Sequence, residues 1–213
     1  MQWTVINKKK TTPQKQISKY GDYKSYLRDE AKNRCVYCAI HENSLGGVDH
    51  FHIEHYKPQS KFPELINNYN NLFYSCPICN RFKSNDWPNE PNQDHSVISY
   101  PNPNGTNYNE LFDIDEHGIL KSTLVAPSYV INKLCLNRPQ LINERNHVEI
   151  DKRLTNALEI LRLHVEHLQQ RIKDPKAVSF LFKIIEIQRD SCKLMIECRT
   201  ICSYEPEEIQ RPK

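Results

Sequence analysis

The apolar and polar positions of this chain follow different patterns from one end to the other. Residues 19–33 carry Tyr23 and Leu27 at helical spacing, so a helix is expected there, after an extended or loose arm over residues 1–16. Residues 35–85 are rich in Cys, His and Asn and show weak periodicity. Such a segment is typical of a fold that bound metal, rather than a large apolar core, holds together.

Regular patterns resume after a long connection. Residues 86–109 are dense in Pro and Asn and are expected to form a loop. Residues 111–125 alternate apolar and polar positions on either side of Glu116-His117-Gly118, which predicts a β-hairpin. Beyond it we expect three helices, over residues 129–136 with Ser128 as the cap, from Pro139 to residue 173, and over residues 176–202 after the break at Asp174-Pro175.

The third of these helices has an unusually wide apolar face. Phe180, Ile184 and Ile187 recur at helical spacing, and Leu181 and Ile185 widen the face beyond a narrow stripe. Such a helix needs a partner on more than one side. Either it is central to its own lobe, which is the usual arrangement, or it contributes to a subunit interface.

Charge and hydropathy limit the setting of the chain. Residues 1–34 hold nine Lys and Arg against three acidic residues, which suits a polyanionic partner, although a run of charge alone is more often a solvated lead-in. No stretch approaches the roughly 18 consecutive apolar residues of a membrane span, and residues 1–10 lack a secretion signal. A cytoplasmic location is therefore expected, where the eight cysteines stay reduced.

Two cysteine pairs have the spacing of zinc knuckles. Cys35-Val36-Tyr37-Cys38 and Cys76-Pro77-Ile78-Cys79 are separated by 37 residues, and their four thiolates suit the closed tetrahedral shell of a structural zinc ion. Two separate redox pairs are the alternative, but neither lies in a βαβ context. The remaining cysteines lie in apolar helical patterns and are most simply buried thiols: Cys135, Cys192, Cys198 and Cys202.

The loop that the knuckles close contains HFHIEHYKPQS, residues 50–60. The motif formed by Glu54-His55 with Pro58, then Asn71-Leu72, then residues 79–84 (CNRFKS), resembles the HNH (ββα-metal) endonuclease motif framed by two zinc knuckles. In that family an acidic residue and a histidine stand in tandem, with proline three places later. Glu54-His55 fits this spacing, whereas Asp49-His50 does not. The resemblance covers residues 35–88, and Glu54 stands where the family more often has aspartate.

The resemblance implies a role for each residue of the motif. His55 is the expected general base, because a neutral imidazole with a pKa near about 6.5 can take a proton from water at cellular pH. Glu54 and Asn80 would supply oxygen ligands to one catalytic divalent cation, Mg²⁺ or Mn²⁺. Asn71 would orient the histidine. Lys83 or Arg81 would hold the phosphate.

One histidine of the cluster has several possible roles, and the knuckle cysteines have zinc binding as their favoured role. His52 is a candidate cation ligand, substrate contact or buried structural histidine. Cys35, Cys38, Cys76 and Cys79 would hold the structural zinc.

Together these observations predict an α+β fold: a zinc-stapled ββα-metal module with a β-hairpin and a C-terminal helical lobe. The expected regions are a basic N-terminal arm and helix over 1–34, the nuclease-like module over 35–88, a linker loop and hairpin over 89–127, and the helical lobe over 128–213.

Three functions are compatible with the sequence. The first is an HNH endonuclease that cuts DNA, alone or as an effector subunit. The second is a non-catalytic zinc-knuckle module that binds nucleic acid through its basic N-terminal segment, and the third is a scaffold whose helical lobe binds protein. The spacing of His55 and Pro58, with oxygen-bearing side chains at 54 and 80, favours the enzyme.

A second, weaker resemblance lies beyond the motif. YNELFDIDEHGIL and the following YVINKLCLNRPQLINER are similar to the tail of bacterial HNH proteins that include the nuclease subunits of Septu-type and retron-linked anti-phage systems. Those subunits act beside an ATPase partner. The resemblance implies a role in anti-phage defence or restriction, with an ATPase partner or a second copy of the chain docked on the C-terminal helices.

Overall fold

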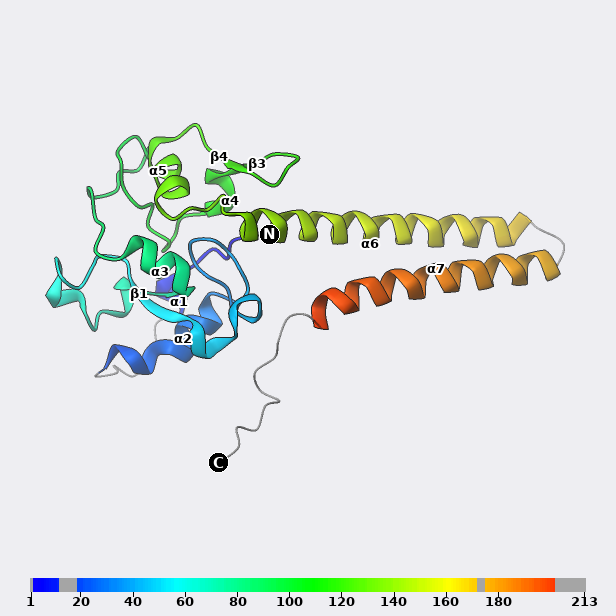
Figure 1. The fold of residues 1–213 in the computed structure, drawn as a ribbon, viewed down its shortest axis with the longest axis horizontal. Coiled ribbons are helices and arrows are strands. Elements are labelled where there is room, and N and C mark those ends of the chain that lie inside the picture. Colours follow the sequence, from blue (N-terminus) through cyan, green and yellow to red (C-terminus); the bar gives the residue numbers. More distant parts are fainter. Residues whose placement is uncertain (1, 12–18, 172–174, 202–213) are drawn as a thin grey trace, which may run out of the picture. The chain divides into compact units, whose positions relative to one another are not determined.

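The computed structural model describes residues 2–11, 19–171 and 175–201 (Figure 1). The described residues divide into two compact units. The first comprises those up to Arg145, and the second begins at Asn146.

The first unit combines short helices with two small antiparallel sheets. Its strands are β1 (His52–His55) paired with β2 (Leu72–Ser75), and β3 (Asp113–Ile114) paired with β4 (Leu120–Lys121). Its helices are α1 (Lys8–Thr11), α2 (Lys24–Glu30), α3 (Pro77–Lys83), α4 (Tyr108–Leu111), α5 (Val125–Lys133) and the beginning of α6 (Pro139–Arg171). The predicted α+β class and the hairpin at residues 111–125 are thereby confirmed.

The β1–β2 hairpin and α3 form a ββα arrangement. The register pairs His52 with Ser75 and His55 with Leu72. All four residues of β2 are buried, because its run of apolar and aromatic side chains has protein on both faces. Helix α3 begins directly after β2, with Pro77 in its first turn, where a missing N–H costs nothing.

A continuous core surrounds this hairpin, although residues 35–85 show weak periodicity. It is built largely from aromatic rings that loops as well as strands supply. Phe51 stacks on Tyr74 with ring centroids 4.9 Å apart, and Tyr56 meets Trp87 edge-on at 4.9 Å. Apolar packing therefore supports this region in addition to any metal.

Of the expected extended or loose arm, residues 2–7 are non-helical but packed against the core rather than loose; residues 12–16 lie outside the described part. Trp3 and Ile6 are buried in the core. The Lys8 ammonium is also buried and donates to Glu30 Oε2 and to the carbonyl of Leu72, both at 2.6 Å. Burial lowers the pKa of Lys8 to about 8, and the neighbouring Glu30 carboxylate opposes that shift.

Two expected helices begin at other residues than predicted. The helix expected over 19–33 is α2, preceded by a 3-10 turn (Tyr20–Tyr23). Helix α5 begins at Val125, so Ser128 lies inside it and donates from Oγ to the carbonyl of Ser122 at 2.9 Å instead of capping. Pro127 is tolerated because it falls in the first turn, where no backbone donor is needed.

The second unit consists of helices. It contains α6 from Asn146 onward and α7 (Pro175–Ile201), which runs antiparallel to it (Figure 1). Phe180 and Ile187 on α7 are 67% and 66% exposed, so this helix is not the buried centre of a lobe as the usual arrangement suggested. No helix in the described ranges is long and apolar enough to cross a membrane.

The cysteines outside the knuckles also differ from expectation. Cys135 is exposed and Cys192 is partly exposed, so neither is a buried thiol. Cys135 lies just beyond the end of α5 and has a φ of +48°. This left-handed backbone conformation takes its side chain off the face that it would occupy if the helix continued. The Cys198 side chain and Cys202 lie outside what the structure describes.

The packed N-terminal segment yields a stability prediction. The Trp3 indole donates to the carbonyl of Tyr37 at 2.9 Å, and its ring lies 5.2 Å from that of Phe112. Trp3→Ala is expected to lower the free energy of unfolding by about 3 kcal/mol or more, measured by urea denaturation of the zinc-loaded chain. Val5→Ala is the matched control, because Val5 is 53% exposed and should cost less than about 0.5 kcal/mol. Equal midpoints for the two variants would contradict the packing of this segment.

Candidate functional site

The four knuckle cysteines converge on one point. All are buried, and their Sγ atoms lie within 4.8 Å of one another. The Sγ atoms of Cys38 and Cys76 are 3.8 Å apart. Four sulfurs at about 2.3 Å from a zinc ion would be separated by roughly 3.8 Å, the edge of the tetrahedron that they form. The cluster therefore fits a structural zinc ion.

Backbone hydrogen bonds fix both knuckles. In the first knuckle, the N–H of Cys35 donates to the carbonyl of Ile40 at 2.9 Å, and the N–H of Val36 donates to Tyr74 in β2 at 3.0 Å. In the second, Cys76 is the N-cap of α3 and its sulfur accepts from the N–H of Cys79 at 3.3 Å. The positive end of the helix dipole at this position favours a thiolate.

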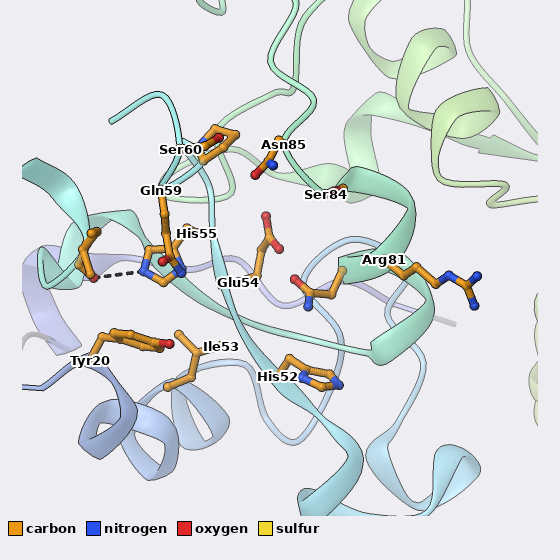
Figure 2. Close-up of a pocket in the computed structure, with 13 residues that line it drawn as sticks. Tyr20, His52, Ile53, Glu54, His55, Gln59, Ser60, Arg81, Ser84 and Asn85 are labelled. Carbon is orange, nitrogen blue, oxygen red and sulfur yellow. Dashed lines mark hydrogen bonds between the residues drawn. The ribbon is translucent and has the colours of Figure 1, made fainter. Parts of the chain in front are cut away.

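A pocket of about 830 Å³ opens where β1 meets α3 (Figure 2). The ββα arrangement brings all four residues of the strand and two of the helix to its wall, among them Glu54, His55, Asn80 and Arg81. Adjacent residues of β1 therefore present a carboxylate and an imidazole to the same space.

Hydrogen bonds define the protonation of His55. Its Nε2 lies 2.9 Å from the carbonyl oxygen of Ile66, which can only accept, so Nε2 carries the proton. Nδ1 then holds the lone pair and accepts from the Gln59 amide at 2.9 Å. Burial lowers the pKa of His55, opposed by the bond to Ile66, and this favours the neutral ring. Tyr20 packs edge-on against the imidazole, with centroids 4.9 Å apart.

Glu54 is buried and held by two residues. The Lys83 ammonium lies 2.6 Å from Oε1, and the Tyr37 hydroxyl donates to the same oxygen at 3.5 Å. Both contacts fall on one oxygen, and the side chain lines the pocket, so Oε2 is the oxygen left for a ligand. Burial raises the pKa of Glu54 to about 7, and the charge of Lys83 opposes the shift.

The two cations expected to hold phosphate lie differently. Arg81 is exposed and lines the pocket. Lys83 is completely buried, with its ammonium between the Glu54 carboxylate and the carbonyl of His55, to which it donates at 3.0 Å. In this structure Lys83 therefore contacts the protein behind the pocket rather than its open side.

Asn71 does not touch the imidazole. Its Oδ1 accepts from the N–H of Lys57 at 2.8 Å, while its Nδ2 donates to the carbonyls of Lys57 at 3.0 Å and Leu65 at 3.4 Å. Ile66, the acceptor for His55, follows Leu65 directly. Asn71 thus holds the loop that positions His55 instead of bonding to the ring.

The oxygens of Glu54 and the Asn80 amide suit a hard divalent cation, and both residues line the pocket. His52 lies at the wall of the same pocket and is exposed.

Sequence reasoning missed Gln59, Tyr20 and Tyr37. No periodicity or family spacing marks these residues, because each reaches the site from a loop or a 3-10 turn.

Comparison with known proteins gives one match. Residues 35–86 match the family model described as HNH endonuclease, which includes both knuckles and every residue of the motif. No curated protein and no solved structure matches the chain.

The cysteine geometry predicts one tightly bound zinc ion per chain. Cys76→Ala is expected to lose the zinc and most of its resistance to urea, because a structural zinc ion contributes folding free energy directly. Metal analysis by mass spectrometry and urea titration measure both effects. Cys135→Ala is the control, since its thiol is exposed and outside the cluster. Zinc retained in full by the Cys76 variant would refute the four-sulfur site.

Proposed function

We propose that the HNH domain of residues 35–86 is a metal-dependent endonuclease that hydrolyses phosphodiester bonds of DNA. The observation that carries the proposal is the pocket in which a neutral imidazole, whose Nδ1 lone pair is bonded only to the Gln59 side chain, faces the same space as a carboxylate and an amide. Phosphodiester hydrolysis needs a proton acceptor for water and compensation of charge on the phosphate, and this pocket offers groups for both.

His55 acts as the general base in this proposal. Its Nδ1 takes the proton of the attacking water, while the carbonyl of Ile66 stabilises the charge that forms on the ring through the Nε2–H bond. Gln59 occupies Nδ1 in the structure and has to yield that position to water. Asn71 fixes the loop on which Ile66 lies, so it is a positioning residue.

Glu54 and Asn80 would hold a divalent cation, Mg²⁺ or Mn²⁺, in this pocket. Such an ion, when bound, polarises the scissile phosphate and neutralises its developing charge. Lys83 and Tyr37 fix one carboxylate oxygen of Glu54 and leave the other directed to the pocket. We therefore assign Lys83 the role of positioning Glu54, and Arg81 the role of binding phosphate.

The finer parts of the proposal rest on sequence. DNA as the polymer follows from the resemblance of residues 35–88 to HNH endonucleases. Anti-phage defence or restriction as the process, and an ATPase partner, follow from the resemblance of residues 108–120 and 129–145. The exposed apolar residues of α7 give a partner or a second copy of the chain a surface to contact. A cytoplasmic location fits both the reduced thiols and such a role.

His55→Ala tests the catalytic assignment. Loss of the general base should slow cleavage of supercoiled plasmid DNA in Mg²⁺ or Mn²⁺ by about 10² to 10⁴-fold, measured by gel electrophoresis. His50→Ala is the matched control, because His50 is exposed in the same segment and is not among the residues that line the pocket.

Equal cleavage by the parent and His55→Ala would reject His55 as the base. Binding of plasmid without cleavage by the zinc-loaded parent would instead favour the non-catalytic nucleic-acid module. The assay is repeated with co-purified partner proteins, so that a requirement for a partner is tested directly.

Arg81→Ala tests the phosphate contact. In a His55→Ala background, which prevents cleavage, Arg81→Ala should weaken duplex binding for all sequences alike. The slope of log K against log salt should become less steep by about 0.9, the value for one lost phosphate contact. Fluorescence anisotropy across a salt series measures it. Arg153→Ala is the control, because Arg153 is an exposed arginine of α6, and it should change neither the binding affinity nor the salt slope. An unchanged slope for the Arg81 variant would contradict the assignment.

A further inference from the structure

Arg138, on the turn between α5 and α6, lies against the zinc cluster. Its Nη2 is 3.7 Å from the Sγ of Cys38 and 4.0 Å from that of Cys76. Its Nη1 is 4.0 Å from the Sγ of Cys79. The guanidinium group therefore faces three of the four sulfurs, and the shortest of its contacts with sulfur is the one to Cys38.

The charge of a loaded centre explains why a guanidinium is placed there. Four thiolates and one Zn²⁺ ion carry a net charge of −2, from −4 and +2, and all four cysteines are buried. Buried charge is costly unless a partner compensates it.

Two of the other sulfurs have neutral donors nearby. Cys76 accepts from the backbone N–H of Cys79 at 3.3 Å, and Cys35 lies 3.7 Å from the Ser75 hydroxyl. When all four cysteines are thiolates, Cys38 cannot share a proton with Cys76. Among the residues that the structure describes, Arg138 is then the side chain that donates to Cys38.

The same guanidinium also holds the end of α5. Its Nη1 donates to the carbonyls of Leu134 at 3.3 Å and Cys135 at 3.4 Å. Pro139, the next residue along the chain, begins α6. The side chain thus contacts the knuckle sulfurs and the residues that follow α5, while the Arg138 carbonyl accepts from the N–H groups of Leu141 and Ile142 at the start of α6. The buried Nε atom has no hydrogen-bond partner, so contact with the sulfurs and carbonyls determines the placement.

We propose that Arg138 is an outer-shell residue of the zinc centre, which donates to the Cys38, Cys76 and Cys79 thiolates and couples zinc binding to the attachment of α6. Lysine cannot replace it, since a single ammonium does not span three sulfurs as the planar fork does. By linkage, a residue that strengthens zinc binding is itself held more firmly when zinc is present. The proposal concerns the zinc centre alone and stands or falls independently of nuclease activity.

Zinc release from the full-length, zinc-loaded chain tests the proposal. Transfer to the chromophoric chelator 4-(2-pyridylazo)resorcinol is followed at constant pH. Arg138→Gln should release zinc about 10-fold faster than the parent or more, the usual effect of losing an outer-shell partner. Arg34→Gln is the matched control, because Arg34 donates to the carbonyl of Ala39 in the first knuckle at 3.0 Å and should leave the rate unchanged. A rate for Arg138→Gln within twofold of the parent overturns the proposal.

A spectroscopic measurement separates a contact with sulfur from a general loss of stability. In the cobalt-substituted protein, removal of a hydrogen bond to thiolate should move the sulfur-to-cobalt charge-transfer band to longer wavelength in Arg138→Gln but not in Arg34→Gln. An unmoved band overturns the proposal. If Arg138→Gln does not fold, Arg138→Lys decides: a shifted band with faster release supports the fork contact, and parental values for both refute it.

Discussion

The first unit is organised around four buried cysteine sulfurs, which a zinc ion would join into a cross-link between residues 35–38 and 76–79. Two four-residue strands are too short to form a stable hairpin by themselves. The cross-link closes the loop that contains both strands, and the bond from Val36 to Tyr74 joins the first knuckle directly to β2. The second knuckle begins α3. The cysteine cluster therefore connects the strand and the helix that together supply the pocket.

The pocket is arranged around a buried ion pair. Glu54 and Lys83 are both almost inaccessible to solvent, and each would be costly to bury without the other. Their pairing keeps a carboxylate in place at the base of the pocket. The neighbouring His55 is bonded to a backbone carbonyl instead of a charge, and its burial favours the neutral form against the effect of that bond. Two adjacent residues thus acquire different electrostatic environments from the two sides of one short strand.

Much of this arrangement was predictable because it is local. The knuckle spacing, the position of Pro58 and the start of α6 at Pro139 each follow from a few neighbouring residues. The direction of Lys83 was missed, although it lies one helical turn from Asn80 on α3 and therefore shares its inward face. Arg81 is turned by about 100° from Asn80, which places it toward solvent.

Contacts between distant parts of the chain left no such signal. Trp3, Ile6 and Lys8 lie in a polar segment without periodicity, and their burial depends on partners at residues 30, 37 and 72. Gln59 reaches Nδ1 of His55 from a loop, where no repeat restricts the choice of residue. The exposure of α7 was equally unpredictable, since an apolar stripe has the same sequence whether its partner belongs to the chain or not.

The buried ammonium of Lys8 has a consequence for where this domain begins. It lies beneath β2, 4.1 Å from the Tyr69 ring centroid and 4.5 Å from that of Phe73, with its charge paired to Glu30. The matched family segment begins at residue 35. A chain trimmed to that boundary therefore loses both Lys8 and Glu30, together with the cation that packs on the two aromatic rings. The smallest autonomous folding unit therefore starts well upstream of the recognisable motif, near the first tryptophan.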